Sequence, residues 1–123
     1  MMKNVAIVSL SSGIIGEPFV RFEVEIGLRR LQEYGLNVKF MPNALMGLEF
    51  LREHPEKRAE DLLQAFRDPD IDMILCAIGG DDTYRLLPYL FEHNELAEAV
   101  TDKVFLGFSD TTVNHFMLHT VGL

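Results

Sequence analysis

The segment "IDMILCAIGGDD", residues 71–82, lies between two predicted helices. Before it, residues 57–67 place their apolar side chains on one helix face, and the "DPD" that follows ends this helix. Residues 71–78 are mostly apolar and predict a strand, which runs into two glycines. A helix from about Thr83 to Leu90 follows the glycines. This order of helix, strand, turn and helix is typical of an α/β fold.

The same alternation extends toward the N-terminus. Residues 4–10, "NVAIVSL", are β-branched and apolar at successive positions, which is typical of a strand buried on both faces of a parallel sheet. Residues 18–35 carry apolar side chains at helical spacing, and Gly35 is placed to end that helix. Residues 36–41 alternate like a second strand, and residues 42–57 predict a loop with a short helical turn.

The alternation also extends toward the C-terminus. Residues 95–100, "ELAEAV", predict a short helix, residues 103–108, "KVFLGF", a fourth strand, and residues 109–119 the helix after it. Alternating strands and helices with short connections indicate an open parallel sheet. We therefore predict an α/β fold with helices on both faces of the sheet, a flavodoxin-like three-layer αβα domain that spans residues 1–123.

Composition limits the classes of partner. The chain has 123 residues, 48% of them hydrophobic, which is enough apolar material for one domain with a core. Its net charge of −8 disfavours nucleic acid and anionic membrane surfaces as partners. No apolar run approaches the roughly 20 residues of a membrane span, and the single cysteine, Cys76, has no partner for a disulfide. We expect a cytoplasmic protein in which Cys76 is a core residue.

Three polar or glycine-rich loops follow predicted strands. They are "SLSSG" at 9–13, "IGGDD" at 78–82 and "GFSDTT" at 107–112. In open parallel sheets, ligands bind at the carboxyl ends of the strands, where these loops would converge. We therefore expect a functional site at that edge of the sheet.

The glycine pair Gly79 and Gly80 has two interpretations. A phosphate cradle often adds a lysine, but here Asp81 and Asp82 follow, which argues against a bound nucleotide. Bare backbone amides suit an oxyanion hole, which holds the negative oxygen of a transition state. Alternatively, the glycines only make the turn, and Asp82 or Thr83 caps the next helix. The sequence leaves both interpretations open.

Ser109 also has two interpretations. Between a strand and a helix, its Oγ would be exposed beside the N–H of Asp110, as in a nucleophile elbow. The sequence "GFSDT" nevertheless lacks the second glycine of the G-x-S-x-G pattern. Serine is equally among the preferred N-cap residues and would need no other role as a cap.

A serine nucleophile needs a base, and none of the four histidines supplies a convincing one. If a helix begins at Ser109, His115 and His119 lie about 9 and 15 Å along its axis, too far to reach Oγ. His54 and His93 lie in charged segments and are expected to be solvated. A catalytic site built from these residues alone would be incomplete.

Three separated segments resemble one protein family. They are "VAIVSLSSG" at 5–13, "RAEDLLQAFRDPDIDMILCAIGGDDTYRLLPYL" at 58–90 and "KVFLGFSDTTVNHFMLHTVGL" at 103–123. In this order and at this spacing they look like the N-terminal half of the LD-carboxypeptidase family of serine peptidases. The "GGDDT" loop is similar to that of the branch containing the microcin C immunity proteins. The resemblance covers essentially the whole chain.

The resemblance implies a serine carboxypeptidase of the LD-carboxypeptidase or microcin C immunity type, acting on a small peptide or peptide conjugate without a metal or other cofactor. It implies that Ser109 is the nucleophile and that the amides of Gly80 and Asp110 form the oxyanion hole. Three residues of the glycine loop are expected to contact the substrate: Gly79, Asp81 and Asp82.

In this family the histidine and glutamate of the Ser-His-Glu triad come from a C-terminal domain, and typical members are more than twice this length. We therefore expect residues 1–123 to be the nucleophile-bearing N-terminal domain without its C-terminal domain, and to have little or no activity alone. The surface that would face the missing domain and a free edge strand favour self-association, so a homodimer is expected. The alternative is a non-catalytic flavodoxin-like domain that binds a small ligand or regulates a partner.

Overall fold

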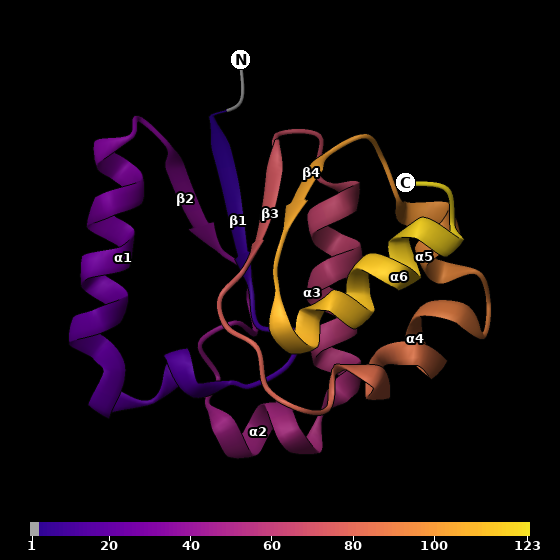
Figure 1. Ribbon diagram of the computed structural model, residues 1–123, viewed down its shortest axis with the longest axis horizontal. Coiled ribbons are helices and arrows are strands. Elements are labelled where there is room, and N and C mark those ends of the chain that lie inside the picture. Colours follow the sequence, from indigo (N-terminus) through magenta and orange to yellow (C-terminus); the bar gives the residue numbers. More distant parts are fainter. Residues whose placement is uncertain (1–2) are drawn as a thin grey trace.

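The computed structural model describes residues 3–123, and its centre is a sheet of four parallel strands. The strands are β1 (Asn4–Val8), β2 (Asn37–Phe40), β3 (Met73–Cys76) and β4 (Val104–Leu106). Their order is β2-β1-β3-β4, so β1 and β3 occupy the middle (Figure 1). The predicted α/β fold with an open parallel sheet is confirmed.

Six α-helices surround the sheet within the described residues. They are α1 (Arg21–Glu33), α2 (Leu48–Glu53), α3 (Pro55–Arg67), α4 (Leu87–Phe91), α5 (Glu95–Ala99) and α6 (Thr112–Thr120). Four short 3-10 turns accompany them: η1 (Ile14–Gly16), η2 (Pro18–Val20), η3 (Thr83–Leu86) and η4 (Ser109–Thr111). None of the helices in residues 3–123 has the length and apolar character that crossing a bilayer requires.

Three α-helices begin later in the sequence than predicted. The helices predicted from Pro18, Thr83 and Ser109 each open with a 3-10 turn, and the α-helix begins three or four residues later. Segment 42–57, predicted to be mainly loop, contains α2 and the first residues of α3. The first residue of α3 is Pro55, which suits that position because a first-turn N–H has no intrahelical acceptor.

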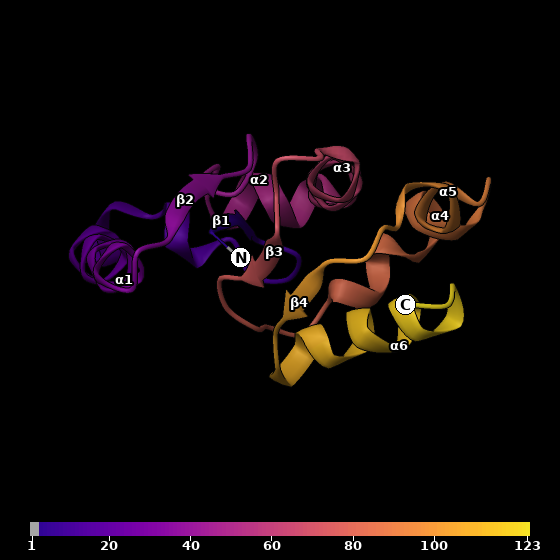
Figure 2. The same cartoon turned by 90° about the horizontal axis from the view of Figure 1, so that it is seen from above.

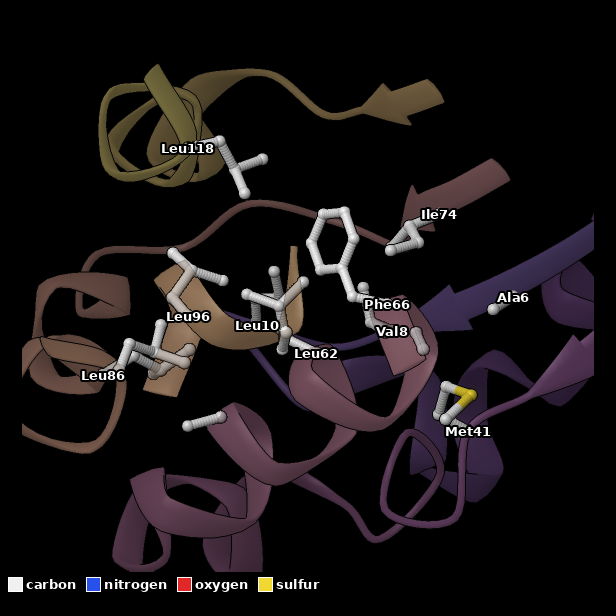
Figure 3. Close-up of a cluster of buried hydrophobic side chains, with 14 of the residues drawn as sticks. Ala6, Val8, Leu10, Met41, Leu62, Phe66, Ile74, Leu86, Leu96 and Leu118 are labelled. Carbon is white, nitrogen blue, oxygen red and sulfur yellow. The ribbon is translucent and has the colours of Figure 1, made fainter. Parts of the chain in front are cut away.

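The larger core lies between the sheet and α3. Leu62 and Phe66 of α3 are at most 1% exposed and belong to one cluster with residues of β1 and β3 (Figure 3). Leu86, Leu96 and Leu118 extend this cluster to η3, α5 and α6. The helices that follow β3 and β4 are therefore held by the same core as the strands themselves.

The opposite face of the sheet packs against α1, which lies across the sheet from α3 (Figure 2). Val5, Ile7 and Met73 are buried on this face, whereas no residue of α1 is fully buried. Helices thus lie on both faces, as predicted, but they cover the two faces unequally. Toward the edge strand β4, the side chains of Leu106 and Phe108 remain 47% and 84% exposed.

Candidate active site

The three loops predicted to converge do meet at the carboxyl edge of the sheet. The backbone N–H of Ser12, after β1, donates to the carbonyl oxygen of Gly79, after β3, at 3.1 Å. The hydroxyl of Ser11, also after β1, donates to the Asp110 carboxylate, after β4, at 2.5 Å. These two bonds join the three loops around Ser109.

Ser109 has an unusual backbone conformation. Its φ is +61°, in the left-handed region, and Asn94 is the only other residue besides glycines with positive φ in residues 3–123. Asparagine visits this region readily, but serine there costs roughly 1–2 kcal/mol. Strained residues of this kind concentrate at functional sites.

The helix-cap interpretation of Ser109 is wrong. An N-cap serine has extended backbone and accepts a bond from an N–H in the first helical turn. Here the N-cap position of η4 is Phe108, the left-handed Ser109 is already inside the turn, and no side chain caps it. The Ser109 side chain is exposed, and α6 proper begins only at Thr112. Its hydroxyl is therefore free to meet a ligand.

The strain at Ser109 can be measured by substitution. We expect the Ser109→Gly variant to be more stable than Ser109→Ala by about 1 kcal/mol, because glycine has no Cβ to clash in the left-handed region. Thr112 is the matched control, since its φ of −58° is helical and should make the alanine variant the more stable one. Urea unfolding of the four variants measures both differences. An alanine preference at both positions would contradict strain at Ser109.

Gly79 leaves space directly beside Ser109. A Cβ at Gly79 would lie 3.0 Å from the Ser109 Cβ, 3.1 Å from its Oγ and 3.4 Å from the Asp110 backbone nitrogen. The absence of that Cβ opens a position next to both the hydroxyl and the Asp110 amide. An oxygen that becomes negative during attack by Ser109 would need such a position.

Gly80 is required by a close approach of two loops. Its φ is +158°, and a Cβ there would collide with the Ser11 hydroxyl and lie 2.9 Å from the Ser12 nitrogen. Only glycine allows the loop after β3 to lie against the loop after β1 in this way. The predicted oxyanion role of the Gly80 amide stays a prediction.

Asp82 lies in an ion pair that the sequence did not indicate. Its carboxylate accepts from Nη1 and Nη2 of Arg58, at 2.9 and 3.3 Å, and Nη1 of Arg85 lies 3.6 Å away. The Arg58 side chain is fully buried, and Nη1 also donates to the carbonyl oxygens of Leu10 and Ser11. Arg58 therefore joins the loop after β1 to the loop after β3.

The structure tests one of the roles predicted for Asp81 and Asp82. Asp82 occupies the N-cap position of η3 without a capping side-chain bond, so the idea that its carboxylate caps the helix is wrong. Asp81 is exposed. Contact of Gly79, Asp81 or Asp82 with a substrate stays a prediction.

Two hollows meet at this edge. One, of about 420 Å³, is mostly apolar and includes Ile14, Ile78, Phe108 and Ser109 in its lining. The other, of about 310 Å³, is polar and charged. Its lining comprises Ser11, Ser12, Gly13, Leu48, Arg52, Gly80, Asp81 and Asp82. Because Ser12 and Gly80 border both, a ligand at Ser109 could place an apolar part in one hollow and a charged part in the other.

Other reactive side chains near the site are occupied or inert. Cys76 lines the apolar hollow, but burial raises the pKa of its thiol to about 12, so it stays protonated. His115 bonds to the carbonyl oxygen of Gly107 at 2.9 Å and packs edge-on against Phe105. No histidine within the described part of the chain bonds to Ser109, which agrees with the distances expected for His115 and His119. Among residues 3–123, no group of three or more His, Cys, Asp or Glu side chains is arranged to hold a metal ion.

Comparisons with known proteins show the family to which the chain belongs. Residues 5–123 match the family described as LD-carboxypeptidase N-terminal domain. An MccF-like protein from Streptococcus pneumoniae, solved in complex with AMP, is 63% identical, with a TM-score of 0.98 over 99% of this chain and 36% of its own. The murein tetrapeptide carboxypeptidase of Pseudomonas aeruginosa is 33% identical over 81% of this chain and 32% of its own.

A further relative is the microcin C7 self-immunity protein MccF of Escherichia coli. It is 35% identical over 70% of this chain and 24% of its own length. The chain spans about a third or less of the curated relatives it matches. The similarity therefore concerns the N-terminal domain of longer proteins.

Proposed function

Because the chain belongs to the LD-carboxypeptidase family, we propose that it is the nucleophile-bearing part of a serine carboxypeptidase that hydrolyses a C-terminal amide bond. The observation that carries this proposal is the left-handed Ser109, exposed on the turn after β4 beside the space left by Gly79. A general base and its orienting carboxylate, the histidine and glutamate of the family, would come from outside residues 1–123.

In the proposed reaction, the Ser109 Oγ attacks the carbonyl carbon of the amide while the base takes its proton. The backbone N–H groups of Asp110 and Gly80 would hold the oxygen of the tetrahedral intermediate. The C–N bond then breaks, the amine leaves with the proton from the base, and an ester to Ser109 remains. Water hydrolyses that ester with the help of the same base.

The proposed substrate is a small peptide or a peptide conjugate. Structures of MccF contain aspartyl sulfamoyl adenosine and glutamyl sulfamoyl guanosine, and the pneumococcal MccF-like protein was solved with AMP. In this chain, Gly79, Asp81 and Asp82 would face the peptide part of the substrate across the two hollows. Reaction in the cytoplasm and a homodimer, formed through the surface that would face the second domain or through an unpaired edge strand, remain the expectations from the sequence.

The test adds a segment that would supply the proposed histidine and glutamate. Residues 1–123 are joined to the remaining two-thirds of the pneumococcal MccF-like protein, whose corresponding segment is 63% identical. The joined protein is incubated with a fluorophosphonate, which forms a covalent adduct with activated serines, and its intact mass is measured. We expect one adduct, located at Ser109 by peptide mapping, and none after Ser109→Ala.

Thr120→Ala is the matched control, because it removes an exposed hydroxyl at the last residue of α6, at the opposite end of that helix from Ser109, and should leave labelling unchanged. An adduct that persists after Ser109→Ala would contradict the proposed nucleophile. No adduct on the unmodified joined protein would favour the non-catalytic binding domain instead.

A further inference from the structure

We propose that the Asp110 carboxylate is a positioning group, which holds Ser109 in its left-handed conformation and aims the Asp110 amide at the reacting oxygen. The functional part of this inference rests on the proposed serine chemistry. It gives the Asp110 side chain a role separate from that of its backbone N–H.

The Asp110 carboxylate connects all three loops of the site. Its Oδ2 accepts the Ser11 hydroxyl at 2.5 Å and the backbone N–H of Thr83 at 2.9 Å. Ser11 is 3% exposed and Thr83 is fully buried, so both donors have fixed surroundings. Bonds to a carboxylate are stronger than bonds between neutral groups, and two of them converge here on one oxygen.

Both donors are themselves held by the framework of the fold. The Thr83 hydroxyl donates to the carbonyl oxygen of Leu10 at 2.8 Å. The carbonyl oxygen of Ser11 accepts from the buried Arg58 at 3.1 Å. Ser11 and Thr83 are therefore held in place by other contacts. If the turn after β4 relaxed, Asp110 would lose its hydrogen bonds to them.

This arrangement acts on Ser109 through the peptide bond between the two residues. A left-handed serine persists only where its surroundings prevent relaxation. The Ser109 hydroxyl has no hydrogen-bond partner within the described residues, so the restraint comes from its neighbours. With the Asp110 side chain fixed, the plane of the Ser109–Asp110 peptide is fixed too, and with it the direction of the Asp110 N–H.

The hydrogen bonds of the Asp110 carboxylate also indicate that it positions the turn and does not take part in catalysis directly. Oδ2 is engaged by Ser11 and Thr83, and neither Asp110 oxygen bonds to Ser109 within residues 3–123. No lysine or arginine of the described chain forms an ion pair with Asp110. The carboxylate thus serves backbone and hydroxyl donors alone, as expected of a group that shapes a turn.

The test compares Asp110→Ala with Asp110→Asn in the 123-residue chain by NMR. Asparagine keeps one carbonyl oxygen that can accept both hydrogen bonds, whereas alanine keeps none. The readouts are the HN–Hα coupling of Ser109, which reports its φ, and the hydrogen exchange of the Thr83 amide. Asp81→Ala is the matched control, because it removes an equal charge from the neighbouring loop at an exposed side chain.

For Asp110→Ala we expect the Ser109 coupling to change and Thr83 to exchange at least about tenfold faster, with the fold retained. Asp110→Asn should restore the wild-type coupling and most of the Thr83 protection, and Asp81→Ala should leave both unchanged. A folded Asp110→Ala variant with the wild-type coupling and Thr83 exchange would overturn the proposal. Equal changes in the alanine and asparagine variants would also overturn it.

Two further measurements test the positioning role of Asp110 if the first variant does not fold or if the joined protein is inactive. If Asp110→Ala does not fold, Ser11→Ala removes one of the two donors and must still shift the Ser109 coupling. In the joined protein, Asp110→Ala should slow fluorophosphonate labelling at least tenfold, and Asp110→Asn should recover most of the rate. If the unmodified joined protein is never labelled, the proposed enzyme fails, but the NMR comparison still decides the positioning role.

Discussion

Replacing Arg58 by methionine is expected to lower the free energy of unfolding by about 3 kcal/mol. The Arg58 side chain is fully buried and donates to the Asp82 carboxylate and to the carbonyl oxygens of Leu10 and Ser11. Methionine fills a similar volume but leaves these acceptors without their donor. Because Asp82 is 21% exposed and has Arg85 nearby, we expect the lower end of the range for broken buried pairs.

The free energy of unfolding of Arg58→Met is measured in urea, with Arg67→Met as the control. Arg67 is exposed in the last turn of the same helix, so its replacement should lower the free energy of unfolding by less than about 1 kcal/mol. A double-mutant cycle with Asp82→Asn isolates the pair. Asp82→Asn alone should be destabilising, and Arg58→Met should cost less in its presence. Strictly additive losses would show that the ion pair does not join the two loops.

Arg58 also shows where prediction from the sequence ends. The apolar face of α3 is visible in the spacing of its leucines and phenylalanine, and the strands in their apolar runs, because local pattern and burial agree there. Arg58 lies beside Ala59 on that helix, but an arginine is normally exposed, and nothing local indicates that Asp82, 24 residues later, pairs with it. Contacts between distant loops depend on the assembled sheet.

The candidate site was predictable to a similar extent. Loops at the carboxyl ends of parallel strands must share one edge, so their convergence follows from the α/β order. Serine, however, suits both a helix cap and a nucleophile. The backbone φ angle that separates the cap from other conformations cannot be predicted from the residues around Ser109. The left-handed turn at Ser109 excludes the helix cap. This turn and the hydrogen bonds of Asp110 with Ser11 and Thr83 arise only when the three loops meet.

Substitution of Gly79 by alanine is expected to separate reactivity from stability. Gly79 does not have the positive φ of Gly80, so alanine fits its backbone conformation. The new Cβ would lie 3.0–3.4 Å from the Ser109 side chain and the Asp110 nitrogen, contacts that are tight but can be relieved by small shifts. We expect the free energy of unfolding to change by less than about 1 kcal/mol.

The same methyl group would occupy the space in which the oxyanion must form. Loss of access to one such amide lowers turnover by about 100-fold or more, so labelling of the joined protein by fluorophosphonate should slow to that extent. Gly27→Ala is the matched control, because Gly27 lies exposed in α1 with nothing within 4 Å of a new Cβ. It should label normally and gain about 0.5–1 kcal/mol of stability from better helix propensity.

Gly80→Ala completes the comparison, because its Cβ would collide with Ser11 and its φ is unfavourable for alanine, so both stability and labelling should fall. A Gly79→Ala variant that is labelled at the wild-type rate would place the oxyanion elsewhere, and the Asp110 amide could then no longer be assigned to it. A variant that loses labelling only in proportion to its stability would make Gly79 a residue of the turn alone. Loss of labelling at unchanged stability is the result that the geometry of Ser109, Asp110 and Gly79 requires.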